Sequence, residues 1–89
     1  MTTTLSKEHA RIQHTIRKLL NRRQVGASIC PSDAARAIYP SDEWLGQMPV
    51  IREVAALMVA AGELEITQKG EIVTAHEVRG PIRLRIASD

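Results

Sequence analysis

The chain of 89 residues carries 12 basic and 10 acidic side chains, which gives a formal net charge of +2 at pH 7. This length predicts one domain that buries about 60–65% of the surface exposed by its unfolded chain, and a hydrophobic content of 44% argues against intrinsic disorder. The longest apolar-rich stretch, residues 54–62, is too short to cross a membrane and no signal peptide follows Met1, so we expect no association with a membrane.

A first helix is predicted from about Lys7 to about Arg23, after a flexible segment at residues 1–5. Ser6 is its expected N-cap, because a serine hydroxyl accepts a hydrogen bond from the first turn of a helix. Apolar residues recur at helical spacing and form one stripe, made of Ile12, Ile16, Leu19 and Leu20. Basic residues follow another face, namely Arg11, His14, Lys18 and Arg22. This basic face has two interpretations, a surface that grips phosphate or an ordinary solvated surface.

Two prolines delimit the next helix. Residues 27–30 tolerate a short strand, and Pro31 breaks any helix at that point. Ser32 is the expected N-cap of a second helix over residues 33–39. This helix is expected to end there because a residue that precedes proline, here Pro40, disfavours the α region.

The third main helix is predicted over residues 49–61, with Gly62 as the left-handed residue that ends it. Before it, Ser41 is a further N-cap and predicts a short helical turn that holds Trp44. The inward face of the third helix is expected to contain Val50, Ile51, Val54, Leu57 and Met58. The outward face is expected to contain Arg52, Ala56, Val59 or Ala60, and Glu63. That outward face is small and nearly uncharged.

From Leu64 onward the apolar pattern changes to a period of two, which predicts strands. Lys69 and Gly70 form a tight turn between two strands, because glycine readily adopts a positive φ. Residues 72–73 begin the returning strand, and residues 74–78 form a loop. The last strand is expected to direct its alternate residues Ile82, Leu84 and Ile86 to the core and to leave Arg83 and Arg85 in solvent.

This order of elements predicts an α+β fold for the single domain formed by residues 1–89. We expect a winged helix-turn-helix-like architecture with three main helices and an antiparallel sheet of two to three strands, the wing. The basic tip at Gln68, Lys69 and Gly70 corresponds to the tip of that wing.

Motifs along the chain also resemble a known family. They are residues 29–32, 35–36, 66–70 and 79–83, together with Trp44, Met48, Pro49 and Arg52. In combination they resemble a family of short bacterial proteins classified as a domain of unknown function, over roughly residues 10–87. The resemblance implies a winged-helix-like fold, and it carries no assigned activity.

No pattern in the sequence predicts catalysis, a cofactor or a metal site. There is no glycine-rich phosphate loop and no pair of histidines or cysteines at metal-ligand spacing, and the histidines are scattered, at His9, His14 and His76. Cys30 is the one cysteine, so an internal disulfide is excluded and a reducing, cytoplasmic compartment is expected. Its expected state is a buried, inert thiol, and the alternative is a reactive one. We therefore expect a protein that is not an enzyme and that needs no cofactor.

The distribution of charge favours binding to nucleic acid. Residues 1–24 contain six basic and one acidic side chain, residues 25–65 contain two and six, and residues 66–89 contain four and three. The candidate contacts to duplex DNA are Arg36, Arg52, Gln68, Lys69, Arg79, Arg83 and Arg85. The first turn of the second helix, at Ser32, would offer further N–H groups to phosphate.

Two alternatives stay open. The third helix offers only Arg52 for reading bases, and the middle of the chain is acidic and would repel DNA. The first alternative hypothesis is therefore a module for protein–protein interaction or dimerisation that binds no nucleic acid. The face of the third helix at residues 56, 59 and 60 would then meet a second copy or another protein. In a further alternative, one cluster at the junction of helix and sheet is formed by Arg36, Arg52, Gln68, Arg79 and Arg83. This cluster is either an anion site or a structural set of ion pairs with Asp33, Glu53 or Glu65.

Overall fold

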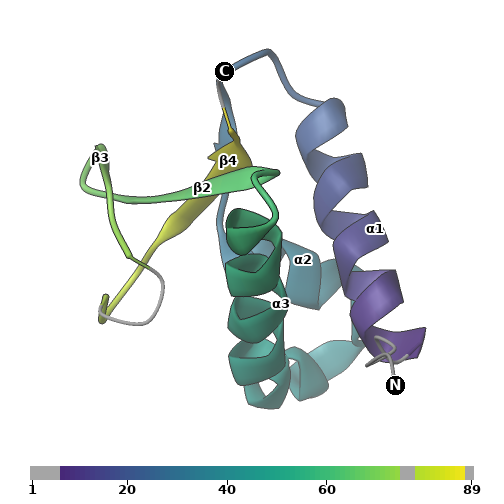
Figure 1. Ribbon diagram of the computed structural model, residues 1–89. Coiled ribbons are helices and arrows are strands. Elements are labelled where there is room, and N and C mark those ends of the chain that lie inside the picture. The colour runs from purple at the N-terminus through teal and green to yellow at the C-terminus, as the bar shows by residue number, and fades with distance from the viewer. Residues whose placement is uncertain (1–6, 75–77, 88–89) are drawn as a thin grey trace, which may run out of the picture.

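A computed structural model describes residues 7–74 and 78–87 of the chain. The elements in order are α1 (Lys7–Asn21), β1 (Ser28–Ile29), α2 (Pro31–Ile38), the 3₁₀ helix η1 (Ser41–Gln47), α3 (Met48–Ala60), β2 (Leu64–Gln68), β3 (Glu71–Ile72) and β4 (Arg83–Ile86). Figure 1 shows the helices together on one side and the sheet on the other. The α+β, winged-helix-like architecture is therefore as predicted. The expected flexibility of residues 1–5, the cap at Ser6 and the loop expected at residues 75–77 lie outside the described residues.

The sheet has four strands in the order β1-β4-β2-β3, and every neighbouring pair is antiparallel. The prediction of two to three strands was wrong, because the two-residue strand β1 pairs with β4 through Ser28 and Ile29. The long partner of β2 is β4, whereas β3 adds only two residue pairs at the outer edge. The chain between β3 and β4 must therefore return past β2 to reach its other side.

The hairpin turn between β2 and β3 is as predicted. Lys69 and Gly70 both have positive φ, at 54° and 85°, and the flanking residues Gln68 and Glu71 pair directly. Two positive φ angles in a two-residue loop are the geometry of a type I′ turn, whose twist matches that of the strands. The side chain of Lys69 is exposed at this tip.

The ends of α2 and η1 differ from the prediction in their caps. Helix α2 begins at Pro31, so its N-cap is Cys30 and not Ser32. Asp33 explains this start, because its carboxylate accepts the backbone N–H of Cys30 at 2.9 Å and stabilises the first turn. The N-cap of η1 is Pro40 and not Ser41, whose φ of 49° lies outside the range of a capping serine.

Helix α3 ends as its sequence predicts. Gly62 has a φ of 82°, and its N–H donates to the carbonyl of Val59 at 2.9 Å. The N–H of Glu63 donates to the carbonyl of Met58, also at 2.9 Å. These two bonds form a Schellman motif and satisfy carbonyls that the helix end would leave unpaired.

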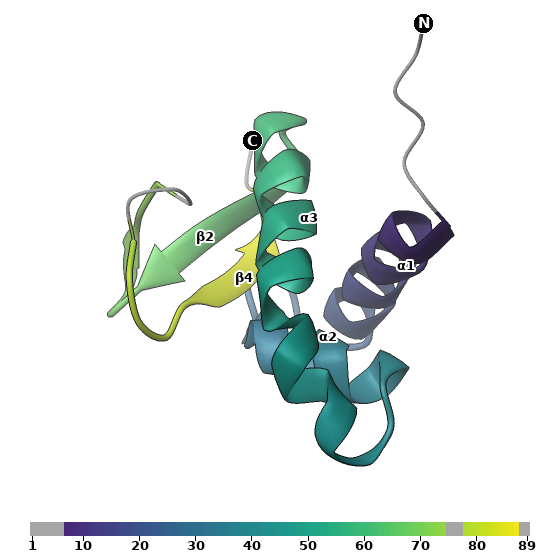
Figure 2. The same cartoon turned by 90° about the horizontal axis from the view of Figure 1, so that it is seen from below.

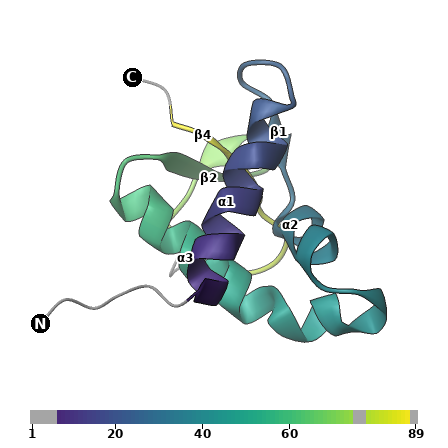
Figure 3. The same ribbon diagram turned by 90° about the vertical axis from the view of Figure 1, so that its right-hand side faces the viewer.

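Helix α1 lies across α2 and α3 and closes the core (Figure 3). Aliphatic residues from all three helices and from the sheet form that core, because the chain has no phenylalanine. The buried set is Ile12, Ile16, Leu20, Ile29, Ala34, Ala35, Ile51, Val54, Ala55, Met58, Leu64, Ile66, Ile82 and Leu84. No helix among the described residues is both long enough and apolar enough to cross a membrane.

Two residues predicted to face the core are exposed. Leu57 is 44% exposed, because the buried stripe of α3 is formed by Ile51, Val54, Ala55 and Met58 and Leu57 lies just beyond its edge. Ile86 is 52% exposed because it occupies the last position of β4, at the end of the sheet. Both positions enter the discussion of binding surfaces below.

An ion pair fastens α1 to the end of α3. Arg17 donates through Nε and Nη2 to the two carboxylate oxygens of Glu63, at 2.8 and 2.7 Å. The hydrogen bond from Arg17 lowers the pKa of Glu63, and the same bond raises the pKa of Arg17. This bidentate geometry orients α1 although both side chains are partly exposed.

Candidate nucleic-acid interface at the wing

We call residues 68–74 and 78–83 the wing. Within it, the loop 79–81 is held by two side chains that are distant in sequence. The amide Nε2 of Gln68 donates to the carbonyls of Arg79 and Pro81 at 2.6 and 3.1 Å, and Nη2 of Arg52 donates to the carbonyl of Gly80 at 2.6 Å. Three consecutive backbone acceptors without strand partners are thus satisfied by α3 and β2. We call Arg52 and Gln68 the clamp.

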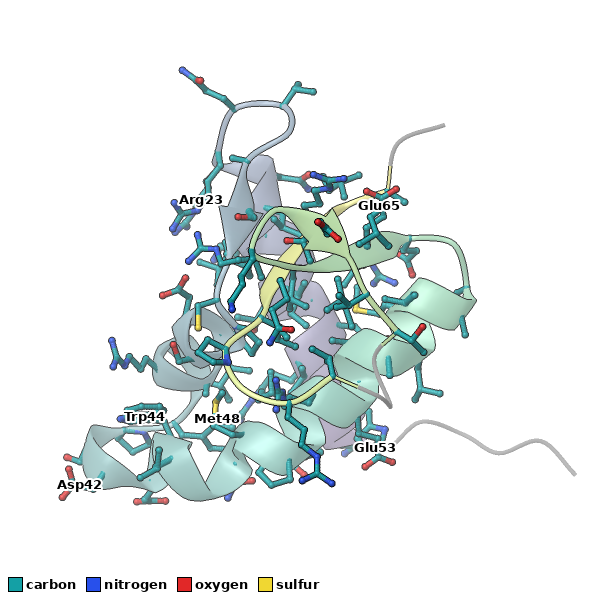
Figure 4. All side chains as sticks on the ribbon, turned by 90° about the vertical axis from the view of Figure 1, so that its left-hand side faces the viewer. Arg23, Asp42, Trp44, Met48, Glu53 and Glu65 are labelled. Atoms are coloured by element: carbon teal, nitrogen blue, oxygen red, sulfur yellow. The ribbon has the colours of Figure 1, made fainter. Side chains whose placement is uncertain are left out.

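The backbone conformation of the loop explains its glycine. Gly80 has a φ of 86°, which L side chains rarely adopt. A Cβ added there would lie 3.6 Å from Nε2 of Gln68, an ordinary contact, so the requirement for glycine comes from the backbone angle. In Figure 4 the loop crosses in front of α3, and the hydrogen bond from Arg52 to Gly80 joins the two.

Two further arginines of the predicted set hold the sheet together. Arg83 donates from Nε to the hydroxyl of Ser28 and from Nη2 to the carbonyl of Ser28, both at 3.0 Å, and so fastens the edge strand β1 to β4. Arg85 pairs with Glu65 across β4 and β2, with 2.8 Å between Nε and Oε1. Opposite charges on directly paired residues stabilise an antiparallel sheet.

Arg36 lies apart from the wing contacts. Its guanidinium carbon is 4.5 Å from the centre of the Trp44 ring, within the range of a cation–π contact. Figure 4 shows Trp44 beside Asp42 and Met48, on the η1 side of the molecule. This contact therefore packs α2 against η1, and the arginine itself stays exposed.

Lys69 and Arg79 are the members of the set whose side chains are exposed and not used in any contact among the described residues. Ion pairs in residues 7–74 and 78–87 are those of Arg17 with Glu63 and of Arg85 with Glu65. The predicted convergence is therefore correct in part. The clamp residues meet at loop 79–81, but they bind carbonyls there, and the ion pair to Glu65 comes from Arg85.

The sequence did not indicate the partners of these side chains. Ser28 and the carbonyls of loop 79–81 were missed because a backbone acceptor has no signature in the residue pattern. Trp44 was noted as a member of a helical turn and of the family motifs, and no signal connected it to Arg36.

Helix α3 presents few groups that can read bases. Its one basic side chain, Arg52, donates to the carbonyl of Gly80. Its exposed residues are Pro49, Glu53, Leu57 and Ala60. Base edges in the major groove are read mainly by Arg, Lys, Asn and Gln side chains, so α3 is poorly suited to that task.

The start of α2 is also a poor phosphate site. The Ser32 hydroxyl donates to Sγ of Cys30 at 3.0 Å. The carboxylate of Asp33 already accepts the N–H of Cys30. A negative charge in the first turn compensates the positive end of the helix dipole and disfavours a second anion there.

Helix α1, which carries the predicted basic face, lies on the opposite side of α3 from the wing (Figure 1 and Figure 2). Its Arg11 lies over the ring of Tyr39 at 5.6 Å from the ring centre, and the Tyr39 hydroxyl donates to Glu8 at 2.5 Å. Burial, followed by this hydrogen bond to Glu8, raises the pKa of Tyr39 to about 12. Lys18 and Arg22 on this face are exposed.

The described residues contain no group of three or more His, Cys, Asp and Glu side chains placed to hold a metal ion. Cys30 is a free thiol that is half-buried, and not buried as predicted. It lies at the start of α2, beside the wing.

A helical domain closed by a small sheet, with a clamped loop and a basic turn, defines a winged-helix-like protein. A family model described as a protein of unknown function, DUF3253, matches residues 9–87, and the chain belongs to this family. None of the curated proteins compared with the chain matches it.

Proposed function

We propose that the protein binds duplex DNA through phosphate contacts made by the wing, without reading base sequence. One observation carries this proposal: Arg79 lies in the loop that the clamp holds, Lys69 lies in the tight turn directly after Gln68, and neither pairs with a carboxylate in the part of the chain described. Cations on a fixed backbone bind phosphate with a smaller loss of conformational entropy than cations on a mobile loop.

The lack of base-reading side chains on α3 supports the proposal that the protein does not read base sequence. Arg52 is used by the clamp, and the exposed side chains of the helix, which include Leu57 and Glu53, offer neither positive charge nor hydrogen-bond donors to a groove. Affinity would then come from phosphate neutralisation, which depends on salt and is indifferent to sequence.

The experiment measures the affinity of a random-sequence DNA duplex at several salt concentrations. We compare the wild type with the double variant Lys69→Asn/Arg79→Ala. Asparagine tolerates the left-handed angle that Lys69 adopts, so the turn is kept while its charge is removed. Each phosphate contact contributes about 0.9 to the slope of log K against log salt, so the variant should flatten the slope by about 2.

The control removes the same amount of charge from α1, through Lys7→Ala/Lys18→Ala. We expect this control to keep the slope of the wild type, because α1 lies on the far side of α3 from the wing. Equal slopes for the wing variant and the wild type, or no binding at low salt, would refute the proposal.

A second candidate function is dimerisation through α3. The observation that favours it is the exposure of Leu57 on a face with Glu53, Ala60 and Ala61, where close approach of another helix is sterically easy. Static light scattering over a range of concentrations tests it. Dimerisation predicts that Leu57→Ser yields a monomer, whereas Ile72→Ser, which removes an exposed aliphatic residue at the edge of the sheet, leaves the dimer intact.

A further inference from the structure

A cleft between the start of α2 and the wing has the properties of a small-ligand site. Its volume is ≈ 300 Å³, and its lining residues are Cys30, Gln68, Lys69, Pro81, Ile82 and Arg83. We infer that this cleft binds a small organic anion, with the apolar part of the ligand against Pro81, Ile82 and Cys30 and its carboxylate or phosphate toward Lys69 and Arg83. Its volume is at the small end of the range of about 300–1,000 Å³ found for ligand pockets.

The walls of the cleft are mainly apolar. Ile82 is buried at 4% exposure, Cys30 is half-buried, and Pro81 has no backbone N–H to leave unsatisfied. The amide nitrogen of Gln68 already donates to two carbonyls of loop 79–81. The ligand therefore needs an apolar body, and hydrogen bonds to this amide nitrogen would contribute little.

The two charged side chains that line the cleft, Lys69 and Arg83, are both positive. Arg83 donates to the hydroxyl and the carbonyl of Ser28, which are neutral acceptors, so the charge of its guanidinium remains. Lys69 has no carboxylate partner in residues 7–74 and 78–87. The carboxylate of Asp33, on α2, accepts the neutral N–H of Cys30 and keeps its negative charge, but it does not line the cleft. Two cations beside apolar walls favour an anion with an apolar group.

This inference goes beyond the proposed binding of DNA and does not depend on it. Lys69 belongs to both sites, so a bound anion would compete with phosphate for that side chain. Arg79 does not line the cleft. The variant Arg79→Ala therefore separates the two proposals, because it should weaken DNA binding and leave the cleft unchanged.

The test titrates the ¹⁵N-labelled protein with benzoate and follows amide chemical shifts. We expect saturable shifts at Cys30, Lys69 and Ile82, with a dissociation constant of about 1–10 mM, as for other ligands of this size. Benzamide, which has nearly the same shape and no charge, should produce no saturable shifts. Benzoate that fails to saturate, or benzamide that binds equally well, would overturn the inference.

Charge variants provide the control. Lys69→Asn should weaken benzoate binding about fivefold, the effect of one contact between unit charges in a solvated site. Lys18→Gln on α1 and Arg79→Ala should leave the dissociation constant unchanged. Equal affinities for Lys69→Asn and Lys18→Gln would mean that the cleft does not recognise the anion.

A second measurement uses Cys30, the one cysteine of the chain, as a reporter inside the cleft. Iodoacetate is an anion, and iodoacetamide is a neutral reagent of similar size. At low salt, the rate of alkylation by iodoacetate divided by the rate by iodoacetamide should be roughly threefold higher for the folded protein than for the urea-unfolded chain. Added salt should abolish this difference between the folded and the unfolded chain. Equal ratios for the folded and the unfolded chain contradict the inference.

Discussion

The clamp makes a prediction about stability that differs from the effect of ordinary surface residues. Replacement by methionine, as Arg52→Met or Gln68→Met, keeps most of the apolar stem and removes the hydrogen bonds to loop 79–81. A side-chain hydrogen bond contributes a net ~0.5–1.5 kcal/mol, and the released carbonyls of this exposed loop can bind water. We therefore expect each substitution to lower the free energy of unfolding by about 1 kcal/mol.

The two substitutions should also be coupled. Once either side chain releases the loop, the other loses part of the fixed geometry of its acceptors. We expect the double variant to be less destabilised than the sum of the single variants, with a coupling of ~0.5–1 kcal/mol. Trp44 is the one tryptophan of the chain, so urea unfolding can be followed by its fluorescence. With a slope of about 1 kcal/mol per M of urea, each single variant lowers the midpoint by about 1 M.

Arg79→Ala is the matched control for the clamp, because it changes the same loop and removes a side chain that makes no contact among the described residues. Its free energy of unfolding should stay within about 0.5 kcal/mol of the wild type. The reasoning fails if Arg79→Ala destabilises as much as Gln68→Met, or if the two clamp substitutions are strictly additive.

Two further predictions concern glycine and tyrosine. Gly80→Ala should destabilise by about 1 kcal/mol, because φ is 86° there, whereas Gly46→Ala, within η1 and without any atom near the added Cβ, should stabilise by about 0.5 kcal/mol in the same urea assay. Tyr39, the sole tyrosine, should titrate near pH 12 in the folded protein, and Glu8→Gln should lower its pKa, measured from the ultraviolet absorbance of phenolate. Because this pKa is raised above its usual value of 10, the associated stability is present below pH 10 and is lost as pH rises to about 12. An identical titration curve for folded and urea-unfolded chains would show that the hydroxyl is not held by Glu8.

Local chemistry explains which parts of the fold were predictable. The turn at Lys69 and Gly70 and the end of α3 at Gly62 each require a positive φ, and glycine marks such positions in a sequence. The buried stripe of α1 was predictable for a similar reason, because its period is that of a helix. These signals involve residues that are neighbours along the chain.

The remaining features depend on partners that are distant in sequence. The acceptors of Arg52 and Gln68 are backbone carbonyls, which every residue has, so nothing in the pattern distinguishes residues 79–81 as the target. Periodicity placed Leu57 beside the buried residues of α3 but could not define the edge of the buried stripe. The same limit applies to the pairing of β1, since a two-residue strand is too short to have a period.

The choice of acceptors by the clamp has an electrostatic consequence. An arginine that pairs with a carboxylate, as Arg85 does with Glu65, contributes no net charge to its surroundings. Arg52 and Arg83 instead donate to neutral oxygens, so both keep their charge close to that of Lys69 and Arg79. Uncharged side-chain donors could satisfy the same oxygens of Gly80 and Ser28. The cations of the wing also repel one another where they lie within a Debye length of ~8–10 Å. Folding alone therefore does not account for this charge, whereas an anionic partner at the wing would be attracted by it.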